Sequence, residues 1–515
     1  MITDLLRARA GERPHAPFIV TPERELSYAE ILDASERMGG LLEKHAIGKG
    51  DHVAILSGNC AAFLVAWFGI NLAGGVAVTL NNALVADGLR YSIDQSDALL
   101  LIVDRDWENS RAAQLSQRQA SLPRIVIEGD ADFLASLSGL PKGEGVAMPA
   151  QAPCTILYTS GTTGLPKGVV NCHNAYSAAG RATVEALGVA ADDRIMVFLP
   201  LFHVNPQMYA VMSALQTGAA LIILRKFSAA TFFDDAIRHG ATGCTFVGTV
   251  LSILVLRHPE ARRDHRIRFF CGGGATPPVW RDIEERFGIK VHEVYGMTEV
   301  GGWSTANSVS VSRFGSCGKP RPDLDVRVVG PDDKPLAPGE AGEIVIRPLE
   351  PDTILTGYYN KPEKMVESVR NLWFHSGDLG SFDADGFLYY HGRAKELIRR
   401  SGEMISPVEI ETQLRVMPGV ADCAVVAVPD DIAGDEIKAV IVSDTLKDAA
   451  KIMAFLSDRL APFMQPRYYE FCDHIPRTET EKIQRMKLQY LDERVIDIRA
   501  SAVGLQPARL PGALA

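Results

Sequence analysis

The chain has 515 residues, of which 47% are hydrophobic, and its formal net charge is −10. This length predicts more than one domain, and the apolar fraction is sufficient for a sizeable buried core. The negative charge argues against nucleic-acid binding, so a polyanionic ligand would need local positive sites. Eight cysteines occur singly and no C-x-x-C pair is present, which argues against a zinc site or a disulfide framework and favours a reducing cytoplasm.

The first part of the chain alternates helical and strand-like patterns. Ser27 and Glu30 form a capping box before apolar residues at helical spacing. Residues 104–150 have a mixed, acidic composition, and we expect a helix and connecting segments there. Strands are expected at 53–56, 76–79 and 98–103, with a helix over 63–70. This alternation is typical of a layered α/β fold.

One apolar run, residues 60–78, approaches the length of a membrane span. Its only polar side chain is Asn71, but Gly69, Gly74 and Gly75 interrupt it and its end resembles a strand. We therefore expect a buried helix followed by a buried strand, and no transmembrane segment. The N-terminus also lacks the apolar core of a signal peptide.

The stretch from Tyr158 to Val170, YTSGTTGLPKGVV, follows a short apolar run at 154–157 that reads as a strand. Glycines allow close backbone approach, and hydroxyls, amide N–H groups and a lysine suit phosphate oxygens. The stretch therefore predicts a loop that wraps a polyphosphate, as opposed to a flexible Gly/Ser/Thr linker. It is not the P-loop G-x-x-x-x-G-K-S/T, because Pro166 stands where the second glycine should be and Gly168 where the Ser/Thr should be. The candidate phosphate-binding residues are Thr159, Ser160, Gly161, Thr162, Thr163, Gly164 and Lys167.

Further α/β units follow this loop, and a β-rich region follows them. Turn signals between short strands predict that β-rich region at about 315–348. A boundary falls at 392–395, after which the chain restarts with its own α/β units. Strands are expected at 194–200, 219–224, 244–247, 267–271, 290–294, 424–428, 438–442 and 468–472, and helices at 232–239, from 406 and at 449–460.

The glycine stretch closely resembles the phosphate-binding signature of the acyl-adenylate-forming superfamily, and the resemblance extends from about Thr21 to about Leu488. It implies a large N-terminal AMP-binding domain over 1–394, with layered α/β subdomains and a β-rich subdomain. It also implies a small mobile α+β domain over 395–515, with Lys395 as the hinge. The pair Arg399–Arg400 before Ser401, Gly402 and Glu403, together with the run at 243–255, resembles the carnitine/crotonobetaine-CoA ligase-like branch.

The resemblance also implies roles for residues of the large domain. Gly273, Gly274 and Ala275 would approach the adenine and the acyl chain. In YGMTE, Tyr295, Gly296 and Met297 would contact the nucleotide, Thr298 the α-phosphate, and Glu299 would bind Mg²⁺. The carboxylate pocket would include His203, Gly248, Thr249 and Trp303. The segment 198–205 has no aspartate for a substrate ammonium group, which argues against an α-amino acid substrate, and His203 could instead be a satisfied histidine at a strand end.

The remaining motifs lie near the boundary and in the small domain. Asp378 would bind both ribose hydroxyls, and Arg393 the ribose or phosphate. Ser401, Gly402 and Glu403 would form the loop that approaches CoA. Lys482 matches the C-terminal lysine that would bridge the carboxylate and the α-phosphate, although Glu481 replaces the usual glycine before it.

These motifs predict an ATP-dependent, Mg²⁺-requiring acyl-CoA ligase. It would form acyl-AMP from a small or medium carboxylic acid and release pyrophosphate, then transfer the acyl group to CoA. The alternatives are an enzyme that loads a carrier protein, a non-catalytic ligand-binding member of the same fold, and a luciferase-like oxygenase. The sequence leaves open the acid, the pathway and whether the protein forms a homodimer.

Overall fold

The computed structural model describes residues 1–159, 166–400, 403–430, 433–477 and 483–498. The chain divides into two compact units. The first comprises 1–327, 345–375 and 385–388, and the second comprises 328–344, 376–384 and 389–515. Within the described residues, no helix combines the length and the apolar character that crossing a lipid bilayer requires.

The first unit contains a seven-stranded sheet in the order β18-β8-β7-β4-β3-β5-β6, whose central strands run parallel. Its strands are β3 (His52–Leu56), β4 (Val76–Thr79), β5 (Leu100–Asp104), β6 (Arg124–Ile127), β7 (Pro153–Thr159), β8 (Lys167–Cys172) and β18 (Gly357–Tyr358). Reading 104–150 as helix and connection missed β6, a partly exposed edge strand of four residues whose apolar signal is weak. The same region forms α5 (Arg105–Arg111), α6 (Gln117–Ala120) and α7 (Asp130–Leu137).

Helix α3 (Ala61–Leu72) confirms the expectation for the apolar run at 60–78. All its residues are buried, and the buried strand β4 follows it. A helix that is apolar all round is buried in the core of a large protein or in a membrane, and α3 lies in the core. Helix α2 (Tyr28–Lys44) begins at the expected capping box, where Ser27 and Glu30 satisfy each other's backbone N–H groups.

A nine-stranded sheet in the same unit has the order β15-β14-β13-β12-β11-β9-β10-β1-β2. From β13 to β1 its strands run parallel. The strands are β1 (Pro17–Val20), β2 (Glu25–Ser27), β9 (Arg194–Val197), β10 (Ala220–Ile223), β11 (Gly243–Val247), β12 (Phe269–Gly273), β13 (Lys290–Met297), β14 (Gly302–Ala306) and β15 (Lys319–Pro320).

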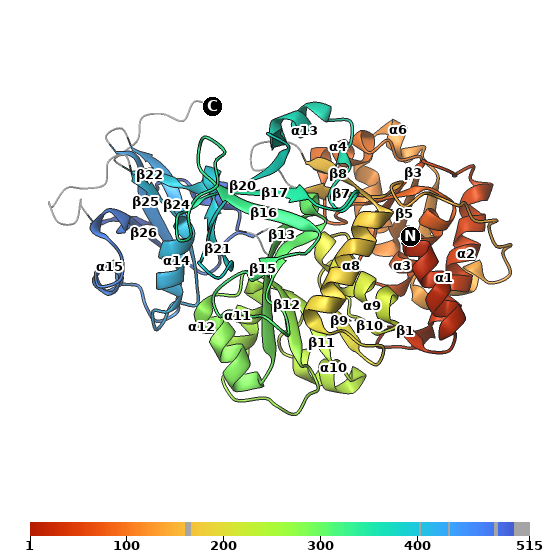
Figure 1. Cartoon of the computed structure of the whole chain (residues 1–515), viewed down its shortest axis with the longest axis horizontal. Coiled ribbons are helices and arrows are strands. Elements are labelled where there is room, and N and C mark those ends of the chain that lie inside the picture. The colour runs from red at the N-terminus through yellow and green to blue at the C-terminus, as the bar shows by residue number, and fades with distance from the viewer. Residues whose placement is uncertain (160–165, 401–402, 431–432, 478–482, 499–515) are drawn as a thin grey trace. The chain divides into compact units, whose positions relative to one another are not determined.

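Helices cover both faces of this sheet, because alternate strand residues point to opposite sides (Figure 1). On β10, Leu221 and Ile223 belong to the core that includes α8 and α9, whereas Ala220 and Ile222 belong to the core beneath α10, α11 and α12. The helices of this unit, besides those already given, are α1 (Ile2–Glu12), α4 (Ala86–Gln95), α8 (His173–Leu187), α9 (Met212–Thr217), α10 (Phe232–His239), α11 (Gly248–Arg257), α12 (Pro277–Asp282) and α13 (Pro362–Ser368).

The β-rich region expected at about 315–348 contains β16 and β17, which belong to a sheet ordered β16-β17-β20-β19, with β21 beside β20. The strands of this sheet are β16 (Leu324–Val329), β17 (Gly342–Pro348), β19 (Val369–Arg370), β20 (Trp373–Phe382) and β21 (Leu388–Arg393). The chain passes between the two units within β16, β17, β20 and β21.

The second unit has a sheet of its own, ordered β23-β22-β25-β26-β27 with β24 beside β25. The strands are β22 (Ile398–Arg400), β23 (Glu403–Ile405), β24 (Asp422–Asp430), β25 (Gly434–Val442), β26 (Tyr468–Cys472) and β27 (Val495–Asp497). Helices α14 (Pro407–Arg415) and α15 (Ala449–Ser457) pack on it around an apolar core. This mixture of helices and strands agrees with the small α+β domain expected after the boundary.

Candidate active site

Three neighbouring parallel strands of the nine-stranded sheet deliver predicted site residues to one edge. Strands β11, β12 and β13 end at Val247, Gly273 and Met297. The residues that follow are Gly248, Gly274 and Thr298, each assigned to the site from the sequence. Ligands of open parallel sheets bind at this carboxyl edge, so the sheet topology itself supports a common site.

Close backbone contacts explain why two positions at this edge are occupied by glycine. A Cβ atom added to Gly248 would lie 1.9 Å from the carbonyl oxygen of Gly274, and one added to Gly296 would lie 2.1 Å from that of Gly302. Gly274 also has a φ of +96°, which favours glycine. The start of α11, which carries Gly248 and Thr249, therefore packs directly against the loop 273–275.

Glu293 holds that loop in place. The two oxygens of its carboxyl group accept hydrogen bonds from the backbone N–H groups of Gly274 (2.5 Å) and Ala275 (3.0 Å). Burial raises the pKa of Glu293 to about 8, against the lowering effect of these two N–H groups. The sequence analysis did not assign Glu293 to the site, although it lies two residues before Tyr295 on the same strand.

We expect Glu293 to make stability depend on pH. The folded protein keeps this proton up to about pH 8, whereas an ordinary glutamate releases it near 4.5. The contribution of Glu293 to the free energy of unfolding is therefore fully present below the ordinary glutamate pKa. It is lost as the pH rises from that value through the raised pKa of the folded protein. Denaturant unfolding across the window should show that loss in the wild type and a flatter profile in Glu293→Gln. The exposed neighbour Glu285→Gln should retain the wild-type profile, and equal profiles for all three proteins would contradict the prediction.

The glycine stretch connects two antiparallel strands. Its first two residues belong to β7 and Lys167–Val170 to β8, so reading the whole stretch as a loop is wrong at both ends. Thr159 and Lys167 are opposite each other in the β7–β8 pair, and they define the base of the connection. Ser160, Gly161, Thr162, Thr163 and Gly164 lie outside the described residues. The Thr159 Oγ1 is buried and has no hydrogen-bond partner among the residues that the structure describes.

Tyr358, on β18, links the glycine stretch to the YGMTE motif. The Lys167 ammonium lies 4.5 Å from the centre of the Tyr358 ring, and the Tyr358 hydroxyl donates to Glu299 Oε1 at 3.1 Å. Burial and the neighbouring carboxylate raise the pKa of the Tyr358 hydroxyl, so it remains a donor. Glu299 is itself 8% exposed, on the short 3₁₀ turn Thr298–Val300. Tyr358 was missed from the sequence, because nothing local pairs it with a residue 59 positions away.

Tyr358→Phe is expected to lower kcat/KM for ATP by roughly tenfold, because Glu299 loses its hydroxyl donor in a buried setting. The ring that Lys167 faces is retained in this variant, and Tyr358→Leu, which removes both interactions, should lose more. Steady-state kinetics at varied ATP and Mg²⁺ would measure the effect. The matched control is Tyr359→Phe, whose hydroxyl bonds Asp97 at an exposed position. Equal losses in the two Phe variants would contradict this role.

A fully buried arginine fixes the segment that follows YGMTE. Arg321 donates to the carbonyl oxygens of Gly301 (2.8 Å), Trp303 (3.0 Å) and Thr353 (3.2 Å), and its Nε pairs with Asp323 at 2.6 Å. Two residues beyond Thr353, the Leu355 N–H donates to the Glu299 carbonyl at 2.9 Å. Arg321 thus holds both chain segments that position Glu299.

The other predicted pocket residues of this unit are placed as follows. Tyr295 is buried on β13, opposite Thr305 of β14. His203 is half-buried after β9, with its ring 4.4 Å from that of Phe202. Trp303 lies in the hydrophobic core and donates to Thr183 Oγ1 at 2.9 Å. Its role as a wall of the acyl pocket therefore stays a prediction.

In the second unit the two predicted nucleotide contacts pair with each other. Arg393 Nε lies 3.3 Å from Asp378 Oδ1, and the Asp378 side chain is 6% exposed. The tight turn before Asp378 is held by Glu343, which accepts from the Gly377 N–H at 3.0 Å, and by the Ser376 hydroxyl, which accepts from the Asp378 N–H at 3.0 Å. The structure thus brings Asp378 and Arg393 together as an ion pair, and their roles in binding the nucleotide stay predictions.

The remaining predicted residues lie in or near the small domain. Lys395 is in the 3₁₀ turn Ala394–Glu396. Glu403 begins β23, opposite Arg400 of β22. Ser401, Gly402 and Lys482 lie outside the described residues.

Comparison with known proteins identifies the family. Residues 6–359 match the AMP-binding enzyme family, and residues 409–482 match the AMP-binding enzyme C-terminal domain. The chain belongs to the AMP-binding enzyme family, and within it to the acyl-CoA synthetases that release AMP. The resemblance seen in the sequence is thereby confirmed.

Relatives of this chain include several CoA ligases. It is 32% identical to sulfoacetate–CoA ligase of Cupriavidus necator over 94% of this chain and 96% of that protein. It is 32% identical to feruloyl-CoA synthase of an Amycolatopsis species, over 92% and 96%. It is 29% identical to crotonobetaine/carnitine–CoA ligase of Salmonella agona, over 90% and 93%.

Solved structures with the same fold include two with nucleotide ligands. One is o-succinylbenzoate CoA synthetase from Bacillus subtilis with its acyl-adenylate intermediate, at a TM-score of 0.85 and 28% identity, covering 95% of this chain and 98% of that one. The other is ATP-bound MatB from Rhodopseudomonas palustris, at a TM-score of 0.86 and 27% identity, with the same coverage.

Proposed function

We propose that the predicted residues carry out two half-reactions on one acid. In the first, a carboxylate oxygen attacks the α-phosphorus of ATP and pyrophosphate leaves, giving acyl-AMP. In the second, the sulfur of CoA attacks the acyl carbonyl, the thiol gives up its proton and AMP leaves. The observation that supports this most is the gathering of Gly274, Thr298 and Gly248 at the carboxyl ends of three adjacent parallel strands.

The protein would act mainly by positioning and by neutralising charge, since phosphoryl-type transfer needs little covalent help. Thr298 would donate to the α-phosphate, Lys167 would face the polyphosphate, and Asp378 with Arg393 would fix the ribose. Lys482 would offset the charge that develops between the carboxylate and the α-phosphate. After adenylation, rotation about Lys395 would replace Lys482 with the loop 401–403 and admit the thiol.

Magnesium fits the residues present. Glu299 offers one buried carboxylate, and the described part of the chain has no group of three or more residues able to ligate a metal ion. Mg²⁺ is commonly bound by one or two carboxylates together with substrate phosphates, which this arrangement suits. When bound, the ion would neutralise charge on the nucleotide phosphates.

The acid would be small or medium in size and would carry a second polar group. Asn205 Oδ1 and Thr245 Oγ1 are buried and have no hydrogen-bond partner within the described residues. Buried oxygens without partners are costly, so a polar ligand group there would be favourable. Asn205 donates to the Phe246 carbonyl at 3.2 Å, which keeps it beside β11. The relatives named for sulfoacetate and ferulate, whose acids carry such groups, are consistent with this class.

The single thiols fit a reducing cytoplasm as the compartment.

A panel of carboxylic acids would test the proposal, with AMP release measured in the presence of ATP and CoA. Acids of matched length with and without a polar terminal group should differ in kcat/KM in favour of the polar ones. Preference for the apolar acids would overturn the proposed substrate class. Turnover only with an acyl-carrier protein would overturn the choice of CoA. Absence of carboxylate-dependent ATP–pyrophosphate exchange with every acid would indicate a binding protein.

A further inference from the structure

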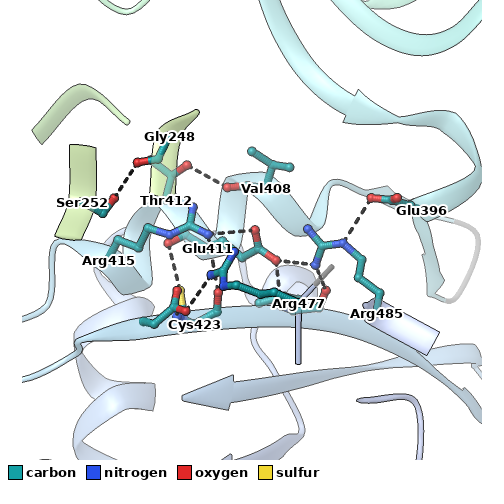
Figure 2. A network of polar contacts seen from close by, with 12 residues as sticks. Gly248, Ser252, Glu396, Val408, Glu411, Thr412, Arg415, Cys423, Arg477 and Arg485 are labelled. Atoms are coloured by element: carbon teal, nitrogen blue, oxygen red, sulfur yellow. Dashed lines mark hydrogen bonds and ion pairs between the residues drawn. The ribbon is translucent and has the colours of Figure 1, made fainter. Parts of the chain in front are cut away.

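Buried ion pairs of the second unit form a cluster whose charges meet partners inside the small domain (Figure 2). Glu411 Oε1 accepts from the Val425 N–H at 2.8 Å and from Arg485 Nη1 at 2.5 Å. Glu411 Oε2 accepts from Arg415 at 3.4 Å. These bonds join α14 to β24, so the cluster stabilises the small domain. A second polar cluster, in the first unit, instead reaches residues predicted to bind the nucleotide.

The second cluster surrounds the start of strand β8, where Lys167 leaves the sheet. Lys167 is the first residue of β8 and is opposite Thr159 of β7. On its other side β8 pairs with β18, an outermost strand of only two residues. Pro166, directly before Lys167, has no N–H group and cannot continue the ladder. Few strand–strand hydrogen bonds therefore fix the backbone at Lys167.

Helix α4, which lies beside β7 and β8, contributes further contacts here (Figure 1). The Tyr91 hydroxyl donates to the Pro166 carbonyl at 3.3 Å. Gln95 Oε1 accepts from the Tyr158 hydroxyl, and Gln95 Nε2 donates to the Tyr359 carbonyl at 2.7 Å. Residues four apart lie on one face of a helix, so Tyr91 and Gln95 reach the same end of the sheet.

Gln95 fastens the chain on both sides of β8. Tyr158 of β7 is opposite Gly168, and the Tyr359 N–H donates to the Gly168 carbonyl at 2.8 Å. Burial raises the pKa of the Tyr158 hydroxyl, so this group remains a donor and the Gln95 carbonyl is its acceptor. Gln95 thus holds both neighbours of Gly168, the residue that directly follows Lys167.

Helix α4 is itself anchored in the first unit. Leu89 and Ile93 belong to a buried apolar core. At the start of the helix, the Ala86 N–H donates to Gln114 Oε1 at 2.8 Å, and Arg90 donates to the Gln114 carbonyl at 2.9 Å. The helix therefore connects the start of β8 to the body of this unit.

We infer that Tyr91 and Gln95 are positioning residues for Lys167, an inference that rests on the proposed role of Lys167 at the polyphosphate. A lysine side chain is long and flexible, so the place that its ammonium reaches depends on how its backbone is held. The Lys167 ammonium lies 4.5 Å from the centre of the Tyr358 ring, and Tyr358 directly precedes the carbonyl group that Gln95 binds. Helix α4 thus holds the chain next to both partners of this contact.

Gln95→Glu tests this role, because a carboxylate can still accept from Tyr158 but places a negative oxygen against the Tyr359 carbonyl. Carboxylate-dependent ATP–pyrophosphate exchange should fall roughly tenfold through a raised KM for ATP, as expected when one hydrogen bond is lost. Thioester formation from supplied acyl-AMP should stay near wild type, since pyrophosphate has already left. Tyr91→Phe, which removes only the bond to Pro166, should show the same pattern at about threefold.

Gln114→Glu is the matched control. Gln114 supports the other end of α4 through an oxygen acceptor that glutamate keeps, and a negative charge is favourable near a helix N-terminus. Both half-reactions should therefore proceed as in the wild type. Equal losses in the two half-reactions of Gln95→Glu would overturn the inference, because they would indicate a general structural role. So would an exchange rate in Gln95→Glu equal to that of Gln114→Glu.

Lys167→Met, measured in parallel, separates this failure from failure of the proposed function. If Lys167→Met lowers pyrophosphate exchange while Gln95→Glu and Tyr91→Phe are without effect, only the positioning role is wrong. If Lys167→Met exchanges normally, the proposed role of the lysine is wrong as well.

Discussion

Lys482→Ala is expected to lower acyl-AMP formation by about two to three orders of magnitude while thioester formation from supplied acyl-AMP continues. The physical reason is that an ammonium group between the carboxylate and the α-phosphate stabilises charge that develops only during adenylation. Losing one such preorganised charge-stabilising group typically costs 10²–10³ in rate. In the second half-reaction the small domain is proposed to have turned, so the lysine is no longer near the reacting atoms.

Two separate assays measure this effect: carboxylate-dependent ATP–pyrophosphate exchange for adenylation, and acyl-CoA formation from acyl-AMP and CoA. Lys487→Ala removes an exposed lysine five residues further along the same segment, and should leave both rates unchanged. If both half-reactions fall equally in Lys482→Ala, the lysine serves both steps and the two-state role proposed for it is wrong.

Local pattern was sufficient to give the bounds of several helices and strands of the fold. The expected strands at 76–79 and 468–472 and the helix at 232–239 agree with the structure at both ends. These segments have apolar periodicity and clear turn signals, so short-range physics decides them. Strand β13 was expected to end at Val294 but continues to Met297, because pairing with β14 extends it beyond the apolar run.

The residues that support the site could not be found in this way. Glu293, Arg321 and Tyr358 act through contacts with partners that the local pattern does not identify. Each lies next to a recognisable motif, yet its own sequence context is ordinary for a strand or a turn. A buried polar side chain near a glycine loop or near Glu299 is a tertiary feature, and only the folded chain brings its partners within hydrogen-bonding distance.

Arg321→Ala is expected to destabilise the first unit by ~3–5 kcal/mol, the range for breaking a buried ion pair by removing one partner. The substitution leaves Asp323 without its guanidinium and deprives the carbonyl groups of Gly301, Trp303 and Thr353 of their donor. Because these carbonyls belong to the segments that hold Glu299, the variant should also show a raised KM for ATP below its unfolding temperature.

The chain provides a matched control in Arg327, which pairs with Asp325 at the same two-residue separation but is 45% exposed. Arg327→Ala should cost less than ~1 kcal/mol, as exposed ion pairs do. Denaturant unfolding and ATP kinetics of the two variants distinguish the effect of burying the arginine from the effect of the local ion pair itself. Equal destabilisation would mean that local pairing alone accounts for the effect of Arg321. A large loss confined to Arg321→Ala would mean that its three carbonyl contacts stabilise the segment behind Glu299.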